Sequence, residues 1–390
     1  MNYTADQRRK LWGILVSLAL VITVAIVLDC LPVNQDLPAD VLDNTTSVTD
    51  PSDVTSDDID SPDKADPSQT DDTTQTTESQ DTQEIDTPGT EPVVEDTSFV
   101  LTFLGECSPG SPLGTSSFGS LNALTNEKGV GYYFSQLQSV ISADDLTVGA
   151  NTCIFTDNNT ASDIIECAAP AANTAIYTAG SVEFLSLAAP ELSEYSDNAL
   201  VDTVSALNSS SIQHAGDGQI TYFENANIRL AIVCLQLTKN LNTADDIALI
   251  HEAKESAEFV AVYFWGGDNG SHIPEEWLTA TLRSFADAGA ALVVGCGNGV
   301  LRPVEQYGSS TIAYSLGTLL DGAALYHQNA TALLQLTLTK NSVGELVSEI
   351  QLIPCYVYKE LWQPCLISDS SDSHSITAFL QGELSSPTQE

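Results

Sequence analysis

The sequence predicts a layered α/β domain that is preceded by one transmembrane helix. An apolar run without charged residues, Leu11 to Leu28, lies close to the start of the chain. From Phe99 onward, strand-like segments alternate with helix-like segments, which is typical of α/β domains. Two further strand-like segments, Ala332 to Thr339 and Leu346 to Tyr356, predict an antiparallel pair near the end.

The start of the chain predicts a basic tail over residues 1–10 and a membrane anchor over residues 11–31. The apolar run is close to the roughly 20 residues that a helix needs to cross about 30 Å of hydrocarbon. Arg8, Arg9 and Lys10 precede the run, whereas the residues after it are acidic. The positive-inside rule therefore predicts a single-pass protein of the cell membrane with a cytoplasmic N-terminus and an extracellular globular domain.

A cleaved signal peptide is the alternative to this anchor. The run is longer than the 7–15 residues of a usual signal core, and no A-x-A-like cleavage site follows it. A lipoprotein signal at Cys30 is disfavoured because Asp29 occupies the preceding position, where a small residue is needed.

Residues 32–97 predict a disordered acidic linker. They are mostly Asp, Glu, Ser, Thr, Gln and Pro, with too few apolar side chains to form a core. The whole chain of 390 residues has a formal charge of −41, which argues against binding to nucleic acid or to anionic lipid surfaces. We interpret this segment as a spacer that lifts the following domain through a cell wall or surface layer.

Residues 98–380 predict the globular domain, and residues 381–390 a disordered tail. Besides the C-terminal pair, strands are expected at 99–104, 150–155, 182–187, 229–235, 259–265, 290–295 and 311–316. Helices are expected at 131–141, 168–179, 197–207, 245–256 and 275–288, the second and the last ending before Gly180 and Gly289.

The eight cysteines show no C-x-x-C spacing of a zinc ribbon or redox motif. Cys234 lies in an apolar run and is expected to be a small buried side chain. Cys355 and Cys365 flank a short excursion and could form a disulfide outside the cell. The sequence leaves the pairing open.

The segment from Phe259 to Gly322 contains a distinctive series of motifs, and weaker ones precede it in a fixed order. The later blocks are Phe264 to Gly266, Asp287 to Ala291, Gly295 to Gly299 and Tyr314 to Thr318; the earlier ones are Phe103 to Glu106, Ala150 to Asn151, Phe184 to Glu191 and Ile212 to Gly216.

These blocks resemble the capsule synthesis protein CapA family, whose members are tied to poly-γ-glutamate capsule biosynthesis and look like calcineurin-type metallophosphoesterases. The resemblance covers Phe99 to about Tyr358. It implies a β-sandwich flanked by helices and a site for two divalent metal ions.

A two-metal site needs oxygen and imidazole ligands from several loops, and this chain departs from the family at most of them. The resemblance places Glu106 at the first Asp, Cys153 at a loop Glu, Phe264 at a His and Cys296 at another His. We therefore predict a degenerate member with no catalytic residues, no bound metal and no other cofactor. The vestigial positions of the metal site are Glu106, Asn151, Cys153, Glu191, Phe264, Asp268, Cys296, Asn298 and Thr318.

None of the five histidines is expected to replace the missing ligands, and each is interpreted as a surface or packing residue. They are His214, His251, His272, His327 and His374.

The loops of Cys107, Cys153 and Cys296 should converge if the fold follows the resemblance. Three unrelated small side chains, a disulfide between two of them, and a thiolate metal site completed by Glu106 or Glu191 are the alternatives. The carboxylates Glu106, Glu191, Glu194 and Asp268 would make the former cleft acidic, unless they are solvated loop residues.

Three classes of function are compatible with these observations. The first is a non-catalytic domain that acts in capsule or envelope polymer assembly by binding a ligand or a partner such as an envelope or capsule synthase. The alternative is an active hydrolase or transferase on a surface polymer with a remodelled site. A display or adhesion module is a third class. The negative charge makes direct binding of a polyanion unfavourable and so favours a protein partner.

Overall fold

The computed structural model describes residues 96–112, 120–158, 167–190, 192, 197–267, 270–297, 299–322, 329–358, 361–367 and 370–387. The predicted basic tail, the anchor and the linker up to residue 95 lie outside these ranges, as do Glu191, Asp268 and Asn298. None of the helices in the described ranges is long and apolar enough to span a membrane.

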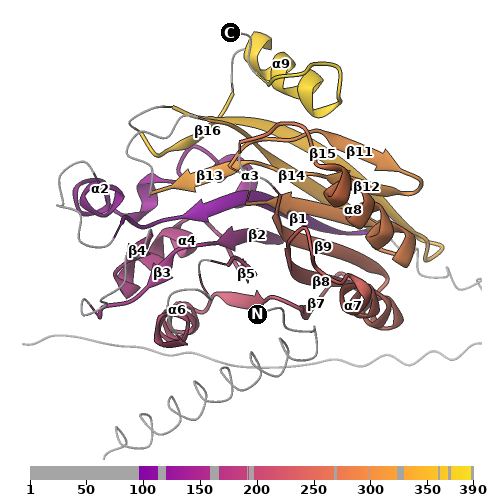
Figure 1. Ribbon diagram of the computed structural model, residues 1–390, viewed down its shortest axis with the longest axis horizontal. Coiled ribbons are helices and arrows are strands. Elements are labelled where there is room, and N and C mark those ends of the chain that lie inside the picture. Colours follow the sequence, from indigo (N-terminus) through magenta and orange to yellow (C-terminus); the bar gives the residue numbers. More distant parts are fainter. Residues whose placement is uncertain are drawn as a thin grey trace, which may run out of the picture. The chain divides into compact units, whose positions relative to one another are not determined.

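Eight of the described strands form the first sheet, in the order β16-β15-β14-β1-β2-β5-β6, with β13 paired to β1 (Figure 1). β1 pairs in parallel with β2 and β13, whereas β14, β15 and β16 are antiparallel. The strands are β1 (Thr97–Ser108), β2 (Leu146–Asn151), β5 (Phe184–Leu187), β6 (Gln213–Gly216), β13 (Thr318–Asp321), β14 (Asn329–Lys340), β15 (Leu346–Val357) and β16 (Pro364–Leu366).

The second sheet has the order β11-β12-β10-β9-β8-β7, and two short strands, β3 and β4, pair separately. Its inner strands run parallel and its two edges are antiparallel hairpins. The strands are β7 (Gln219–Asn225), β8 (Ile228–Leu237), β9 (Phe259–Gly266), β10 (Leu292–Cys296), β11 (Val304–Tyr307) and β12 (Ser310–Ala313), with β3 (Ile154–Phe155) and β4 (Ala168–Ala169) apart.

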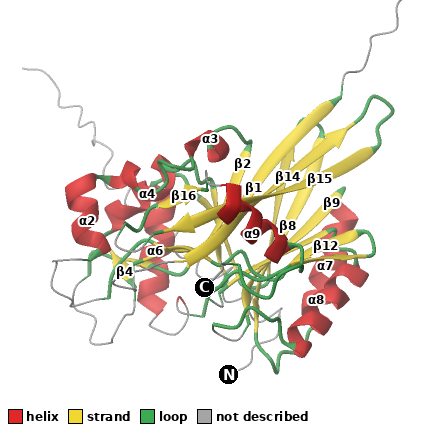
Figure 2. Ribbon diagram, turned by 90° about the horizontal axis from the view of Figure 1, so that it is seen from above, coloured by secondary structure: helices red, strands yellow, loops and turns green. Residues whose placement is uncertain are grey.

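Three buried clusters stack these elements into four layers. The central cluster lies between the sheets and joins side chains such as Phe103 of β1 and Tyr263 of β9. A second cluster packs the first sheet against helices, and a third packs the other sheet against α7 and α8. Figure 2 shows α2, α4 and α6 on one side of the strands and α7 and α8 on the other. The helices are α2 (Leu121–Lys128), η1 (Val130–Tyr132), α3 (Gln138–Ile141), η2 (Ala171–Thr174), α4 (Ala175–Ala179), α6 (Asp197–Ser209), α7 (Ala244–Ser256), α8 (Glu276–Ala288) and α9 (Ser370–Leu380).

The predicted α/β class is therefore confirmed, but two expected helices are wrong in part. Residues 131–141 form η1 and α3 because Tyr133, Phe134 and Leu137 turn into the core between them. Residues 168–179 begin as β4, whose Ala168 pairs with Ile154, and only then become helical. The predicted strand at 311–316 also ends early, at Ala313.

A close approach of two backbones shapes the end of β1. A Cβ atom at Gly105 would lie 2.2 Å from the carbonyl oxygen of Gly317. The next amide, that of Glu106, donates to the same oxygen at 3.0 Å. Position 105 therefore has to be glycine, because any larger side chain would push the Gly317 backbone, which leads into β13, away from β1.

Gly105→Ala should lower the free energy of unfolding by about 2 kcal/mol, in the range typical of overpacked cores. Gly131→Ala is the matched control, because open space surrounds a Cβ at that position. Denaturant unfolding of both variants measures the difference. Equal stability of the two variants would contradict the close approach.

Candidate functional site

The vestigial positions of β1 and β2 lie near the C-terminal ends of these neighbouring parallel strands, and Thr318 begins β13, which pairs in parallel with the end of β1. Glu106 is in register with Ala150 of β2 and with Thr318 of β13, and Cys107 is in register with Asn151. The register of β1 shifts between Phe103 and Glu106, so the strand bulges just before the site. Ligands of open α/β sheets usually bind beyond such strand ends.

Glu106 is the half-buried carboxylate of this region and lies among hydroxyl groups. The Thr152 hydroxyl donates to Glu106 Oε1 at 3.4 Å. Thr152 is also hydrogen-bonded to the hydroxyl of Ser108, and both side chains are buried. The arrangement supplies one carboxylate ligand and two weakly coordinating hydroxyls.

Asn151 is fully buried, and hydrogen bonds within the protein use both ends of its amide. Its Nδ2 donates to the carbonyl of Cys153 at 2.7 Å, and the Tyr177 hydroxyl donates to its Oδ1 at 2.8 Å. Burial raises the pKa of Tyr177 well above its ordinary value, so the phenol stays a donor. Asn151 thus fixes the loop after β2.

The three cysteines expected to converge are buried free thiols in two different clusters. Cys107 and Cys153 belong to the cluster between the first sheet and its helices, whereas Cys296 belongs to the central cluster. Burial, and then the charge of Glu106, raise the pKa of Cys107. Burial also raises that of Cys153. Burial therefore holds both thiols in the neutral form.

Aromatic rings fill the space at the ends of β9 and β10. Phe264 is 1% exposed and belongs to the cluster under α7 and α8, so its ring packs away from Glu106. A Cβ at Gly295 would lie 2.3 Å from that ring. The indole of Trp265 would lie 2.5 Å from a Cβ at Gly297, whose φ of +92° already favours glycine.

Tyr263, a site residue that the sequence analysis missed, joins the two sheets beside the vestigial positions. Its hydroxyl donates to the carbonyl of Leu104 at 2.7 Å, across the buried interface. The sequence did carry a signal for this role, because a tyrosine within the otherwise apolar β9 is expected to be buried, and a buried phenol needs a hydrogen-bond partner.

Arg302 was also missed, and it fixes the loop before α8. Its guanidinium is fully buried, bonds both oxygens of Glu275 at 2.7 and 3.0 Å, and donates to the carbonyl of Ser271. Removing one partner of such a pair would leave a buried charge uncompensated.

Within the described ranges, no three His, Cys, Asp or Glu side chains come together as a metal site. His214 lies in β6, and burial lowers its pKa. His272 donates from Nδ1 to the carbonyl of Leu301 and packs edge-on against Phe379. His251 and His374 lie in α7 and α9, and His327 lies outside the described residues.

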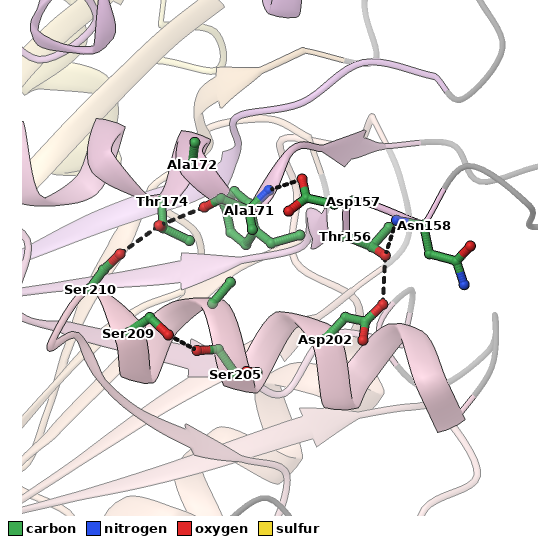
Figure 3. Close-up of a pocket in the computed structure, with 12 residues that line it drawn as sticks. Thr156, Asp157, Asn158, Ala171, Ala172, Thr174, Asp202, Ser205, Ser209 and Ser210 are labelled. Carbon is green, nitrogen blue, oxygen red and sulfur yellow. Dashed lines mark hydrogen bonds between the residues drawn. The ribbon is translucent and has the colours of Figure 1, made fainter. Parts of the chain in front are cut away.

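A polar cavity of about 620 Å³ lies beside β3 and α6, and none of the vestigial positions that the structure describes lines it (Figure 3). Asp202 accepts a hydrogen bond from the Thr156 hydroxyl at 2.6 Å, and Asp157 accepts one from the amide of Ala171. The Thr174 and Ser210 hydroxyls bond each other at 2.6 Å. The described lining contains no Lys or Arg, so the cavity does not favour an anion.

Tyr263→Phe should lower the free energy of unfolding by about 1–2 kcal/mol, because it leaves the buried Leu104 carbonyl unpaired. Tyr307→Phe is the matched control, since its hydroxyl makes only a long, exposed bond of 3.4 Å to Asp287. Denaturant unfolding measures both. A Tyr263→Phe loss no larger than that of the control would refute the inter-sheet role.

Comparison with known proteins identifies relatives over most of this domain. A family model described as bacterial capsule synthesis protein PGA_cap matches residues 100–323, more than half of the chain. The PGA biosynthesis protein CapA of Bacillus subtilis (strain 168) is 35% identical over 98 residues, which span 25% of this chain and 26% of that protein.

Two solved structures resemble the domain more distantly. A phosphatase of Mycoplasma pneumoniae is 11% identical with a TM-score of 0.42, covering 67% of this chain and 94% of its own. A hypothetical protein of Thermus thermophilus is 13% identical with a TM-score of 0.42, covering 67% and 100%. The match to the family model confirms the resemblance seen in the sequence: the chain belongs to the bacterial capsule synthesis protein PGA_cap family.

Proposed function

We propose that this chain is a membrane-anchored, extracellular member of its family that acts in assembly of a poly-γ-glutamate-type capsule or other envelope polymer without metal-dependent catalysis. In this proposal the domain is a pseudoenzyme that binds a partner. The family membership supports the connection with the capsule, and the printed name of the Bacillus subtilis relative agrees with it.

One observation carries the non-catalytic part of the proposal. At the strand ends where the family resemblance places metal ligands, Glu106 is the described vestigial carboxylate, while Asn151, Cys153, Phe264 and Cys296 are buried in packed or hydrogen-bonded surroundings. A two-metal phosphoesterase needs several anionic or imidazole ligands to hold its ions and to lower the pKa of a bound water.

The charge of the chain supports a protein partner over a polymer ligand. A formal charge of −41 would repel a polyanion such as poly-γ-glutamate, and two of these carboxylates, Asp157 and Asp202, line the cavity beside α6 without a cation in its described lining. An envelope or capsule synthase that presents a basic surface would be attracted instead.

The N-terminal sequence supports the proposed location. The basic residues before the predicted anchor at 11–31 and the acidic linker at 32–97 would place the domain outside the membrane at the end of an extended spacer.

Purified full-length chain, prepared with Mn, Fe and Zn in the growth medium, should contain well below one metal equivalent by elemental analysis. Among the described residues, too few ligands converge at the strand ends to retain an ion through purification. Glu106→Gln is the matched control and should leave the metal content unchanged. One or more equivalents in the wild type, lost in Glu106→Gln, would overturn the non-catalytic assignment.

Expressed in bacterial cells, the full chain should sediment with membranes, and protease added to intact cells should remove its C-terminal domain. A variant that lacks residues 1–31 should remain in the soluble cytoplasmic fraction and be protected. A full-length chain that is soluble, or that is membrane-bound but protected from external protease, would refute the proposed topology.

A further inference from the structure

Cys153 and Cys167 lie next to each other at the start of the small parallel pair β3–β4. Ile154 is in register with Ala168, and Phe155 with Ala169, so each cysteine directly precedes the paired residues. The amide of Ile154 donates to the carbonyl of Cys167 at 3.1 Å, which extends the pairing to the cysteine itself. The two side chains therefore share a face of the pair.

This placement satisfies the geometry of a disulfide. Paired strands lie about 4.8 Å apart, which falls inside the Cα separation of roughly 4.4–6.8 Å that disulfides span. The two thiols are already within hydrogen-bonding reach of each other. Both side chains are buried, at 0% and 6% exposure, in the cluster beneath α4 and α6.

We propose that Cys153 and Cys167 form a structural disulfide when the chain folds in an oxidising compartment. The link would fix β3 to β4 at the wall of the polar cavity, to which Phe155 and Thr156 contribute on one side and Ala171 on the other. The proposal takes the oxidising compartment from the proposed extracellular function. The geometry of the two cysteines does not depend on that function.

The other described cysteines are worse placed. Cys355 pairs with Leu366 and Cys365 with Tyr356, so the register puts the two thiols on opposite faces of β15 and β16. The disulfide considered from their spacing is therefore not favoured by the structure. Cys234 and Cys296 lie in the central cluster, apart from the cluster of Cys153. Cys107 and Cys355 share the cluster of Cys153 and are the remaining rival partners.

The reaction is a thiol–disulfide exchange with a small-molecule disulfide such as oxidised glutathione. The Cys153 thiolate attacks the oxidant to give a mixed disulfide and releases one reduced thiol. Cys167 then attacks the Cys153 sulfur and releases the second. Two electrons pass to the oxidant, and the two cysteine protons end on the released thiols. Burial raises the pKa of Cys153, so the exchange belongs to folding, before the pair is enclosed.

The test is to refold the full chain with oxidised glutathione, remove the oxidant, denature the chain and count free thiols. Losing one member of a linked pair frees the other, so Cys153→Ala and Cys167→Ala should each show one thiol more than the wild type. Cys234→Ala, the control, should show one fewer. Cys107→Ala and Cys355→Ala should each also show one fewer, which separates the rival pairings.

Peptide mapping of the oxidised wild type covers the case in which a variant fails to fold. Cleavage at Asp157, Asp163 and Glu166 separates the two cysteines in sequence. Non-reducing mass spectrometry should then find their peptides joined, with a mass two hydrogens below the sum. Separate peptides with one thiol fewer in Cys153→Ala would overturn the proposal. If the peptides are linked but the full chain fails to reach the membrane in the fractionation experiment, the disulfide stands and only the proposed function is refuted.

Discussion

The hydrogen bond from the Tyr263 hydroxyl to the Leu104 carbonyl is the contact on which the arrangement of the two sheets beside the vestigial positions depends. That carbonyl is available because β1 bulges between Phe103 and Glu106, and the bulge is possible because Gly105 lets the backbone at Gly317 approach. Glu106, which follows this bulge, is in register with Thr318, and the β1–β13 register shifts again before Cys107. The irregular backbone at the end of β1 therefore lies where the sheets are joined and the vestigial positions meet. Such bulges often redirect side chains near functional sites.

Much of the fold could be predicted from the sequence because hydrophobic periodicity dominates its interior. The long strands and amphipathic helices, such as β8, α8 and the β14–β15 pair, follow directly from it. The short or polar elements, including β6, β7, β13 and α9, were missed because pairing with or packing on other strands, and not their own periodicity, defines them. The hairpin turn at Ala226 and Asn227, both with positive φ, carried a usable local signal.

The site was predictable in outline and not in detail. Order and spacing of the motifs located Glu106, Asn151 and Thr318, which the register brings to adjacent strand ends. The orientation of Phe264 toward α7 and α8 depends on the alternation of β9 between two cores, which the motif could not reveal. The sequence also did not reveal that Cys153 and Cys167 are neighbours. Residues 168–179 have the pattern of one Ala-rich helix, and β4 forms only because it pairs with β3 in the folded chain.

The central proposal is that the domain keeps its fold without binding a metal ion at the vestigial positions, and diffraction from crystals of the full chain soaked in Mn²⁺ tests it most directly. An anomalous difference map separates a bound metal from a water at any strand end. The account predicts no anomalous peak beside Glu106, with Tyr263 bonded to Leu104 and Phe264 packed beneath the helices. One or two strong peaks coordinated by Glu106 would contradict it.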